Sequence, residues 1–314
     1  FNELIDASIA YLKGKDFVLY PDFPTGGLVD CSKYNNGLRG SVIKVRARIT
    51  KLDKKTLVIT EIPFGQTTSK LIESILKAND KGKIKIRKVD DNTSEGAEIV
   101  VHLHNDISPD KTIDALYAFT DCELSISPNS CVIRDKEPCF LGVDEILRHN
   151  TDYTMHLLKT ELEIRMSELE NAWHYTSLEK IFFEEKIYRV LEQDAKNWEA
   201  QLVKVEEELQ KFRNVLRKDI TREDVLKLVE KPVRKISVFD VKELDQAIKK
   251  IEEEMKEVAH NLATLVDFTI AYYANLKKKY GSKFPRKTEI SNFETIQATK
   301  VVVANAKLYA NKLE

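Results

Sequence analysis

The sequence contains few of the residues that interrupt regular structure or cross-link a chain. Among 314 residues there are only 10 glycines, 8 prolines and 4 cysteines. Scarce glycine and proline favour long helices and strands. Four cysteines in a chain of this length do not suggest a disulfide framework, and they favour a reducing compartment. No apolar run approaches the length of about 18 residues that a membrane-spanning helix needs, so the sequence predicts no membrane span.

The sequence also lacks an excess of charge of either sign. It has 50 basic and 51 acidic residues, and its formal net charge is -1. The overall charge therefore identifies no class of partner, and only the distribution of charge along the chain can do so. Charged residues make up 32% of the chain, which predicts a large solvated surface. The length is sufficient for two domains, or for one domain with an extended part.

The first 140 residues or so alternate between predicted strands and predicted helices. In "GSVIKVRARIT" (residues 40–50), Ile43, Val45, Ala47 and Ile49 alternate with polar residues, which is typical of a half-buried strand. Helices are predicted over 1–14, 67–78 and 108–119, and strands over 40–50, 56–62, 83–89, 97–104, 123–127 and 131–134. This order predicts an α+β fold, with helices layered on sheets.

The pattern changes near Gly142, where a long helical region begins. Residues 143–191 contain hardly a helix breaker, and residues 241–280 carry apolar side chains at alternating steps of four and three, from Leu244 to Leu276. This heptad pattern predicts an antiparallel coiled-coil arm about 60 Å long, at about 1.5 Å per residue. The predicted parts are a mixed domain at 1–141, an outgoing helix at 142–195, a helical knot at 196–240, a returning helix at 241–285, and a linker with a strand at 286–314.

Basic residues are concentrated on two of the predicted strands. Residues 33–51 contain six basic residues and no acidic one, and "KGKIKIRK" (81–88) contains five cations in eight residues. If both strands lie in one sheet, they form a cationic surface that suits phosphates. No aromatic residues alternate with these cations, which favours contact with a duplex backbone over single strands. An ordinary solvated sheet face is the alternative. The candidate DNA-contacting residues are Arg39, Lys44, Arg46, Arg48, Lys83, Lys85 and Arg87.

Other motifs indicate less. "GLRG" (37–40) matches the GxxG loop of KH domains, but that loop joins two helices and here a strand is predicted to follow. His102, His104, Cys122, Cys131 and Cys139 do not have the spacing of a standard zinc site. The sequence contains no P-loop, no nucleophile elbow and no pair of carboxylates that we would assign to catalysis. We therefore predict no metal site and no cofactor in this chain.

Several motifs, taken in order, resemble one family. "YPDFPTGG" (20–27), "GLRGSVIKVRARIT" (37–50), "LVITEIPFGQTTSKLIESI" (57–75), "LYAFTDCELSISPN" and "YGSKFPRKTEI" (280–290) are similar to motifs of the A subunit of bacterial type II DNA topoisomerases, which include gyrase and topoisomerase IV. The resemblance extends from about Tyr20 to Ile290. Thr67 and Thr68 replace the usual Asn-Lys, so we do not assign DNA contact to these two residues. The link "KPVRKISVFDV" (231–241) favours topoisomerase IV over gyrase.

The resemblance implies a division of roles. Residues 1–141 would be the tower-like domain that supports the bent gate DNA, and the helical arm would end in an exit gate formed by two copies of the chain. The family cleaves DNA with a tyrosine that follows an arginine. Here only Tyr153 and Tyr175 precede a threonine, and neither follows an arginine. We therefore assign no catalytic residue, and we expect the cleavage domain upstream of Phe1.

The resemblance also implies partners and location. The B subunit of the enzyme would bind ATP and Mg²⁺, so neither is expected on this chain. The expected partners are double-stranded DNA, a second copy of the chain and the B subunit, in the bacterial cytoplasm near the nucleoid. The expected dimer contacts of the gate are Val233, Ile236, Val238 and Phe239. Alternatively, these four residues cover the core of the arm's own tip, or the whole chain is a non-catalytic coiled-coil dimer with a basic DNA-binding head.

Overall fold

The structure is a computed structural model that describes residues 1–105, 107–134, 136–193, 198–230, 241–294 and 296. It divides into two compact units. The mixed unit contains Phe1–Asn150 and the described residues from Tyr273 on, and the helical unit is Thr151–Tyr272. Helices and several sheets are both present, so the prediction of an α+β fold is confirmed.

The mixed unit contains two four-stranded sheets. The first has the order β10-β1-β2-β7, with β1 at Leu28–Lys33, β2 at Val42–Arg46, β7 at Glu123–Ile126 and β10 at Glu289–Ile290. The pair β1 and β10 is parallel and aligns Leu28 with Glu289, whereas the other two pairs are antiparallel. Val29, Ile43 and Val45 form the buried core of this sheet.

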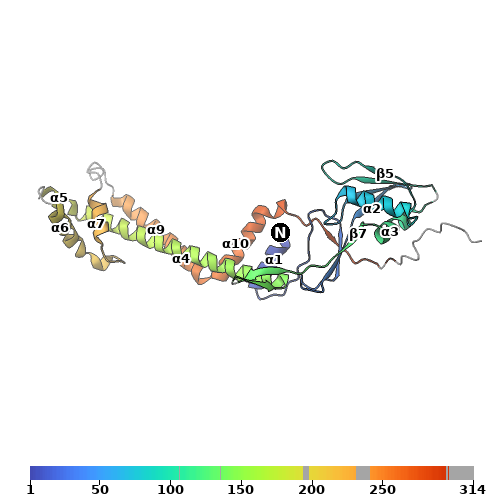
Figure 1. Cartoon of the computed structure of the whole chain (residues 1–314). Helices are drawn as coiled ribbons and strands as arrows, with labels where there is room; N and C mark the ends of the chain where they lie inside the picture. The colour runs from blue at the N-terminus through green and yellow to red at the C-terminus, as the bar shows by residue number, and fades with distance from the viewer. Residues whose placement is uncertain (106, 135, 194–197, 231–240, 295, 297–314) are drawn as a thin grey trace, which may run out of the picture. The chain divides into compact units, whose positions relative to one another are not determined.

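The second sheet is antiparallel throughout, with the order β3-β4-β6-β5. Its strands are β3 (Arg48–Asp53), β4 (Thr56–Glu61), β5 (Ile86–Asp91) and β6 (Ile99–Leu103). The helices α2 (Thr68–Asp80) and α3 (Pro109–Phe119) lie on one side of this sheet (Figure 1). Leu57, Ile59 and Ile99 from the strands pack there against Leu71 of α2 and Leu116 of α3.

The predicted strand over 40–50 is in fact two strands, in different sheets. β2 ends at Arg46 and β3 begins at Arg48, with the fully buried Ala47 between them. The Ala47 N–H donates to the Cys122 carbonyl (2.8 Å), and its carbonyl accepts from the Tyr117 hydroxyl (2.9 Å). Both backbone groups of Ala47 thus bond to residues outside β3 and β4, and the chain changes sheet at this residue. The predicted burial of Ile43, Val45 and Ala47 is confirmed, but the prediction of a single strand was wrong.

The second basic strand also starts later than predicted, at Ile86 rather than Lys83. The backbone N–H groups of Gly82 and Lys83 bond to carbonyls in the last turn of α2, at Asn79 and Ala78, so these residues close the helix instead of pairing with β6. The inward direction of Ile84 and Ile86 is confirmed, at 1% and 5% exposure.

Single residues mark the ends of the three helices in the sheet-containing part of the mixed unit. The helix α1 (Asn2–Leu12) is followed by Gly14 in a left-handed conformation (φ 67°). The N-cap of α2 is Thr67, whose hydroxyl accepts from the Lys70 N–H (3.3 Å). Pro109 begins α3. The strands β8 (Cys131–Arg134) and β9 (Glu137–Phe140) form a separate hairpin.

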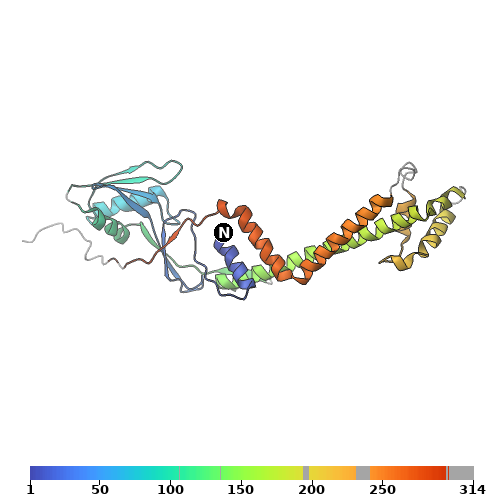
Figure 2. The same cartoon turned by 180° about the vertical axis from the view of Figure 1, so that it is seen from behind.

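The helical unit is built on two long helices that run in opposite directions. α4 (Val143–Glu184) and α9 (Val241–Ala263) lie side by side in both views (Figure 1 and Figure 2). Leu162, Leu169 and Trp173 of α4 are buried against Met255 and Val258 of α9. Ion pairs join Arg165 to Glu254 (2.8 Å) and Lys180 to Asp245 (2.7 Å). The residue numbers rise on one helix as they fall on the other, as an antiparallel pair requires.

The two predicted long helices differ from the observed ones at their ends. The helix predicted over 241–280 is interrupted at Thr264, and α10 continues from Leu265 to Tyr280. α4 ends at Glu184 instead of Leu191, and Lys186 follows in a left-handed conformation (φ 54°). In the part of the chain that the structure describes, no helix has both the length and the apolar content to cross a membrane.

Short helices follow α4 and enclose a separate core. They are α5 (Val190–Gln193), α6 (Trp198–Gln210) and α7 (Arg222–Val229), with 3-10 turns at Ile187–Arg189, Arg213–Val215 and, after α10, Gly281–Lys283. Phe182 of α4 packs there with Leu209 and Leu228. Thr221 and Asp224 form a reciprocal cap at the start of α7. The predicted gate residues Val233, Ile236, Val238 and Phe239, and the predicted strand after residue 298, lie outside the described residues.

Candidate nucleic-acid interface

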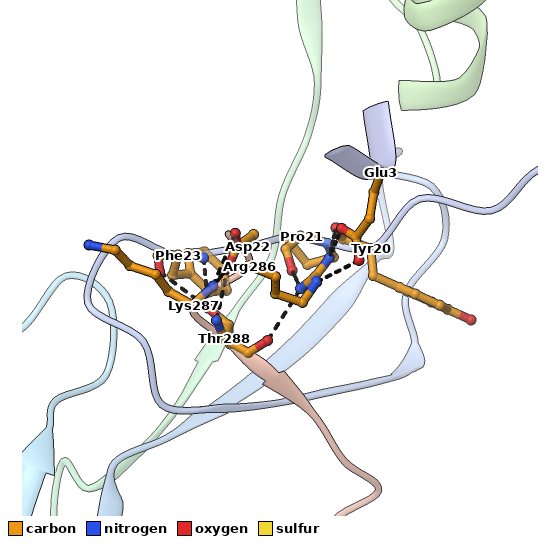
Figure 3. Close-up of polar contacts among 8 residues, drawn as sticks. All are labelled: Glu3, Tyr20, Pro21, Asp22, Phe23, Arg286, Lys287 and Thr288. Atoms are coloured by element: carbon orange, nitrogen blue, oxygen red, sulfur yellow. Dashed lines mark hydrogen bonds and ion pairs between the residues drawn. The ribbon is translucent and has the colours of Figure 1, made fainter. Parts of the chain in front are cut away.

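Two motifs that are far apart in the sequence, "YPDFPTGG" and "FPRKTEI", meet at Arg286 (Figure 3). The Arg286 guanidinium donates to both carboxylate oxygens of Glu3, at 2.7 and 2.5 Å. It also donates to the carbonyls of Tyr20 (3.0 Å) and Pro21 (2.8 Å). The bond to Glu3 raises the pKa of Arg286. One arginine therefore fixes the start of α1 and the loop before β1 to the segment that leads into β10.

Asp22 and Thr288 make the second set of contacts between these motifs. The Asp22 carboxylate accepts from the backbone N–H groups of Lys287 (3.1 Å) and Thr288 (2.9 Å), and the Thr288 hydroxyl accepts from the Phe23 N–H (2.8 Å) (Figure 3). Desolvation acts to raise the pKa of Asp22, but these hydrogen bonds outweigh it, and the pKa lies below its ordinary value. The two motifs are thus held together by hydrogen bonds between side chains of one motif and the backbone of the other.

Glu61 of the "TEIP" motif connects both sheets. Its Oε2 accepts from the Gly27 N–H (2.5 Å) and from Nε of Arg48 (2.9 Å), and Arg48 donates further to Glu289 (3.0 Å). The bond to Glu61 raises the pKa of Arg48. Gly27 has a left-handed conformation (φ 84°), and a Cβ there would lie 2.5 Å from the Arg46 carbonyl. This position therefore requires glycine.

Arg46 is enclosed by its contacts, and its side chain is only 11% exposed. Its Nε donates to Glu123 (2.6 Å), and its guanidinium lies 4.6 Å from the Tyr117 ring centroid and 4.1 Å from that of Phe293. Burial raises the pKa of Tyr117 to about 12. Lys44, on the same strand, pairs with the other oxygen of Glu123 (3.1 Å). These contacts of the Arg46 guanidinium are therefore all made within the mixed unit.

The predicted cationic surface is divided between separate places. Lys44 and Arg46 lie in the first sheet, Arg48 lies on one edge strand of the second sheet, and β5 is the strand at the opposite edge. The condition that both basic strands share one sheet is therefore met only for Arg48, because the chain changes sheet at Ala47 and Lys44 and Arg46 stay in the first sheet. Sequence patterns did not identify the carboxylates Glu61, Glu123 and Glu289, since their proximity depends on strand pairing over long sequence separations.

The other predicted cations do not pair with carboxylates among the described residues. Lys83 and Arg87 are exposed, and Lys85 is partly buried. Arg87 has no opposing residue on β6, because the register shifts between Ile86 and Lys88. Arg39 is exposed in the loop between β1 and β2. Among the described residues, none of these four cations lies within ion-pair distance of a carboxylate.

The motifs to which the sequence assigned no function occupy ordinary structural positions. The "GLRG" loop joins two strands, β1 and β2, rather than two helices. Cys122 is buried in the core, and its pKa is raised to about 12 by desolvation. His102 pairs with Asp90 (3.1 Å). Within the described ranges, no three His, Cys, Asp or Glu residues gather where they could hold a metal ion. Tyr153 and Tyr175 both lie on α4.

Comparison with known proteins is consistent with the motifs. A family model described as the A subunit of DNA gyrase/topoisomerase IV matches residues 1–274. The A subunit of DNA topoisomerase 4 from Borreliella burgdorferi is 35% identical over 314 residues, which cover 100% of this chain and 50% of that protein. The protein of the same name from Staphylococcus epidermidis is 23% identical over 309 residues, covering 94% of this chain and 36% of that protein.

The A subunit of DNA gyrase from Lawsonia intracellularis is 30% identical over 167 residues, which cover 49% of this chain and 20% of that protein. The chain thus spans half or less of the length of these relatives. The range that the family model matches, residues 1–274, contains the whole helical unit and all of the motifs quoted above except "YGSKFPRKTEI". The chain therefore belongs to the A-subunit family of DNA gyrase and topoisomerase IV.

Proposed function

We propose that this chain is part of the DNA breakage-reunion subunit of an ATP-dependent type II DNA topoisomerase. The observation that carries the proposal is the family match over residues 1–274. Two relatives that match most of the chain are named as A subunits of DNA topoisomerase 4, which favours topoisomerase IV over gyrase. Such an enzyme opens a double-strand break, passes a second duplex through it, and reseals the break.

The two units would have different tasks in this cycle. The mixed unit would support the arms of the bent gate DNA, and the helical unit would be the coiled-coil arm that ends in the exit gate. The antiparallel packing of α4 and α9 through Leu162, Leu169 and Met255 supports the second assignment. In this proposal two copies of the chain meet through residues 231–240, at Val233, Ile236, Val238 and Phe239.

The contacts of the cations suggest how they divide their roles. Arg39, Lys83, Lys85 and Arg87 would contact phosphates directly, since none of them pairs with a carboxylate among the described residues. The role of the remaining three cations would be to hold the fold of the DNA-supporting unit, because each is paired with a glutamate. These are Lys44, Arg46 and Arg48. Contact with the backbone suits a protein that reads the bending of duplex DNA rather than base edges.

ATP and Mg²⁺ would be bound by the B subunit, the partner in the complete enzyme. The described residues of this chain contain no group of three His, Cys, Asp or Glu side chains that could hold a metal ion. The complete assembly would act on the nucleoid in the bacterial cytoplasm.

A chimera tests the proposal. The homologous half of the Borreliella burgdorferi protein would be replaced by this chain and combined with the cognate B subunit, ATP and Mg²⁺. We expect ATP-dependent relaxation of supercoiled plasmid without introduction of negative supercoils. This chain alone should not cut the plasmid, because it has no tyrosine in the cleavage context.

The chimera also distinguishes the proposed function from the alternative of a non-catalytic protein. A folded chimera that binds duplex DNA but neither cuts nor relaxes plasmid would contradict the proposed function. That result would favour a non-catalytic dimer with a basic DNA-binding head. Cutting by this chain alone would show that a cleavage residue was missed.

A further inference from the structure

We propose that a groove along α2 is a contact site for the phosphate backbone of duplex DNA, formed by Lys70, Lys77, Lys81 and Lys83. These residues differ, except for Lys83, from the cations that strand patterns indicate. The inference rests on the proposed function, because it places part of the DNA support at a defined surface of the mixed unit.

The groove has a volume of about 440 Å³ and lies between α2, the turn after it and the end of α3. Lys70 and Lys77 line it from α2, Lys81 lines it from the C-cap of that helix, and Lys83 and Phe119 line it from the turn and from α3. The spacings of seven and four residues place Lys70, Lys77 and the C-cap residue Lys81 on one face of the helix. The neighbouring face carries Leu71, Ile75 and Ala78, which are buried against the second sheet. Packing thus fixes the lysine face toward the groove.

The charges in the groove leave a positive excess. Its two carboxylates are Glu73 and Asp121. Glu73 is held by Lys77 (2.6 Å), and Asp121 accepts from the side-chain amide of Gln66 (3.2 Å). Lys70, Lys81 and Lys83 have no carboxylate within ion-pair distance among the described residues. The cations of β2 and the start of β3 differ in this respect, because glutamates already pair with them.

Phe119 fixes one wall of the site. The Lys83 ammonium lies 5.3 Å from the centroid of the Phe119 ring, within the range of a cation–π contact. Phe119 is the one aromatic side chain among the residues described as lining the groove. Since a lysine already covers it, the groove offers no free ring on which an unpaired base could stack. This favours a duplex backbone over a single strand.

The length of the lysine row favours a polymer over a single anion. Lys70 and Lys81 are separated by about 16 Å along the helix, at about 1.5 Å per residue. One phosphate group placed at either end would leave the other end unneutralised. A DNA strand carries a charge about every 3.4 Å along the duplex axis, so several phosphates could lie along this row at once.

The test compares duplex binding by the whole chain and by a triple variant, Lys70→Gln, Lys81→Gln and Lys83→Gln. Binding to a duplex of mixed sequence, about three helical turns long, would be measured by fluorescence anisotropy across a series of salt concentrations. Each lost phosphate contact should reduce the slope of log K against log salt by about 0.9. Three lost contacts should therefore lower the slope by about 2 to 3. Arginine at the same three positions should restore it.

A control variant changes the same number of exposed lysines elsewhere in the mixed unit: Lys13→Gln, Lys15→Gln and Lys54→Gln. The magnitude of its slope of log K against log salt should be greater than that of the groove variant. The wild-type chain could bind duplex while the groove variant shows an unchanged slope and an unchanged circular dichroism spectrum. That result would contradict DNA contact at the groove and would leave the proposed function intact. If the wild-type chain does not bind duplex at all, DNA support by this chain fails as well. Displacement by inorganic phosphate at constant ionic strength would indicate a single-anion site and overturn the assignment to duplex DNA.

Discussion

Arg46 makes two kinds of contact with one planar group. Its guanidinium bonds to a carboxylate and stacks on two rings. A lysine has the same charge but lacks the flat guanidinium that fits between rings and reaches a carboxylate in a fixed direction. The choice of arginine at this position therefore reflects the packing between β2, α3 and the segment after β10.

Replacing Arg46 by lysine should destabilise the mixed unit by about 1–3 kcal/mol, because the change weakens a hydrogen bond to a charged group and removes the stacking on Tyr117 and Phe293. Urea unfolding, followed by circular dichroism, measures the loss. DNA affinity at constant salt should change little as long as the unit is folded, because the Arg46 guanidinium is enclosed.

Arg87→Lys is the matched control, because Arg87 is exposed and the described residues include no carboxylate paired with it. We expect its unfolding free energy to stay within about 0.5 kcal/mol of the wild type. If Arg46→Lys is as stable as the wild type but binds DNA more weakly, then Arg46 contacts phosphate directly.

Asp30 gives the mixed unit a pH-dependent contact. Its carboxylate accepts from the N–H groups of Ser32 (2.8 Å) and Phe293 (3.0 Å). Desolvation acts to raise the pKa of Asp30, but these bonds outweigh it and lower the pKa below its ordinary value of 3.8. A lowered pKa means that the stabilisation is fully present above that value and is lost as the pH falls through the lower, folded-state pKa.

The variant Asp30→Asn should therefore be less stable than the wild type at neutral pH. The difference should shrink as the pH falls below 3.8, the ordinary pKa value of this carboxyl group. Thermal unfolding of both proteins at neutral, mildly acidic and strongly acidic pH measures this. A stability difference that is the same under all three conditions would show that the charge of Asp30 contributes nothing.

At the scale of elements, the apolar spacing of the long helices identified their contact. The steps of four and three from Leu244 onward placed Met255 and Val258 on the face that packs against α4. The interruption at Thr264 was not visible in that spacing. The Thr264 hydroxyl donates to the His260 carbonyl (2.8 Å), which also accepts from the Thr264 N–H (2.9 Å); a side-chain bond of this kind often bends a helix.

Leu169→Ala should destabilise the helical unit by about 2–5 kcal/mol, since it removes a buried side chain and leaves a cavity. Leu169 is 4% exposed and lies in the same cluster as Trp173. The sequence has two tryptophans, and in a Trp198→Phe background the fluorescence of Trp173 alone reports on this helix pair during urea unfolding.

Ile164→Ala is the control on the same helix, because Ile164 is 57% exposed. Its effect should stay within about 0.5 kcal/mol. Equal losses in the two variants would mean that Leu169 is not in a packed seam.

The strands were predictable only in part. Alternation showed which side chains of residues 40–50 point inward, because that depends on each residue and its neighbours. The change of sheet at Ala47 depends on Tyr117 and Cys122, which are about 70 residues away. The same holds for the pairing of Arg46 with Glu123. The sequence thus identified the cations of the candidate site but not their partners.

At the scale of the whole molecule, ordered motifs identified the family. They did not show that "YPDFPTGG", "TEIP" and "FPRKTEI" contact one another through Arg286, Thr288 and Glu61. These motifs hold the mixed unit together, so their resemblance to the family reflects a shared fold as much as a shared contact with DNA.

The proposed gate predicts a homodimer. Phe239→Asp should halve the mass measured by light scattering at tens of micromolar protein, because a charge would be buried in a two-fold contact. The helical circular dichroism signal should not change. Val215→Asp is the control, since Val215 is a 64% exposed valine of the helical unit, and it should remain dimeric. A wild-type chain that is already monomeric would contradict the gate.

The pairing of β1 with β10 has a consequence for the order of synthesis. Asp30 and Phe293 are bonded to each other although they are 263 residues apart. A ribosome adds about 5–20 residues per second, so β1 waits for roughly 13 to 50 s before β10 is made. During that time the edge of the first sheet is open to pairing with other chains. The unit whose sequence begins first is therefore the last to be completed.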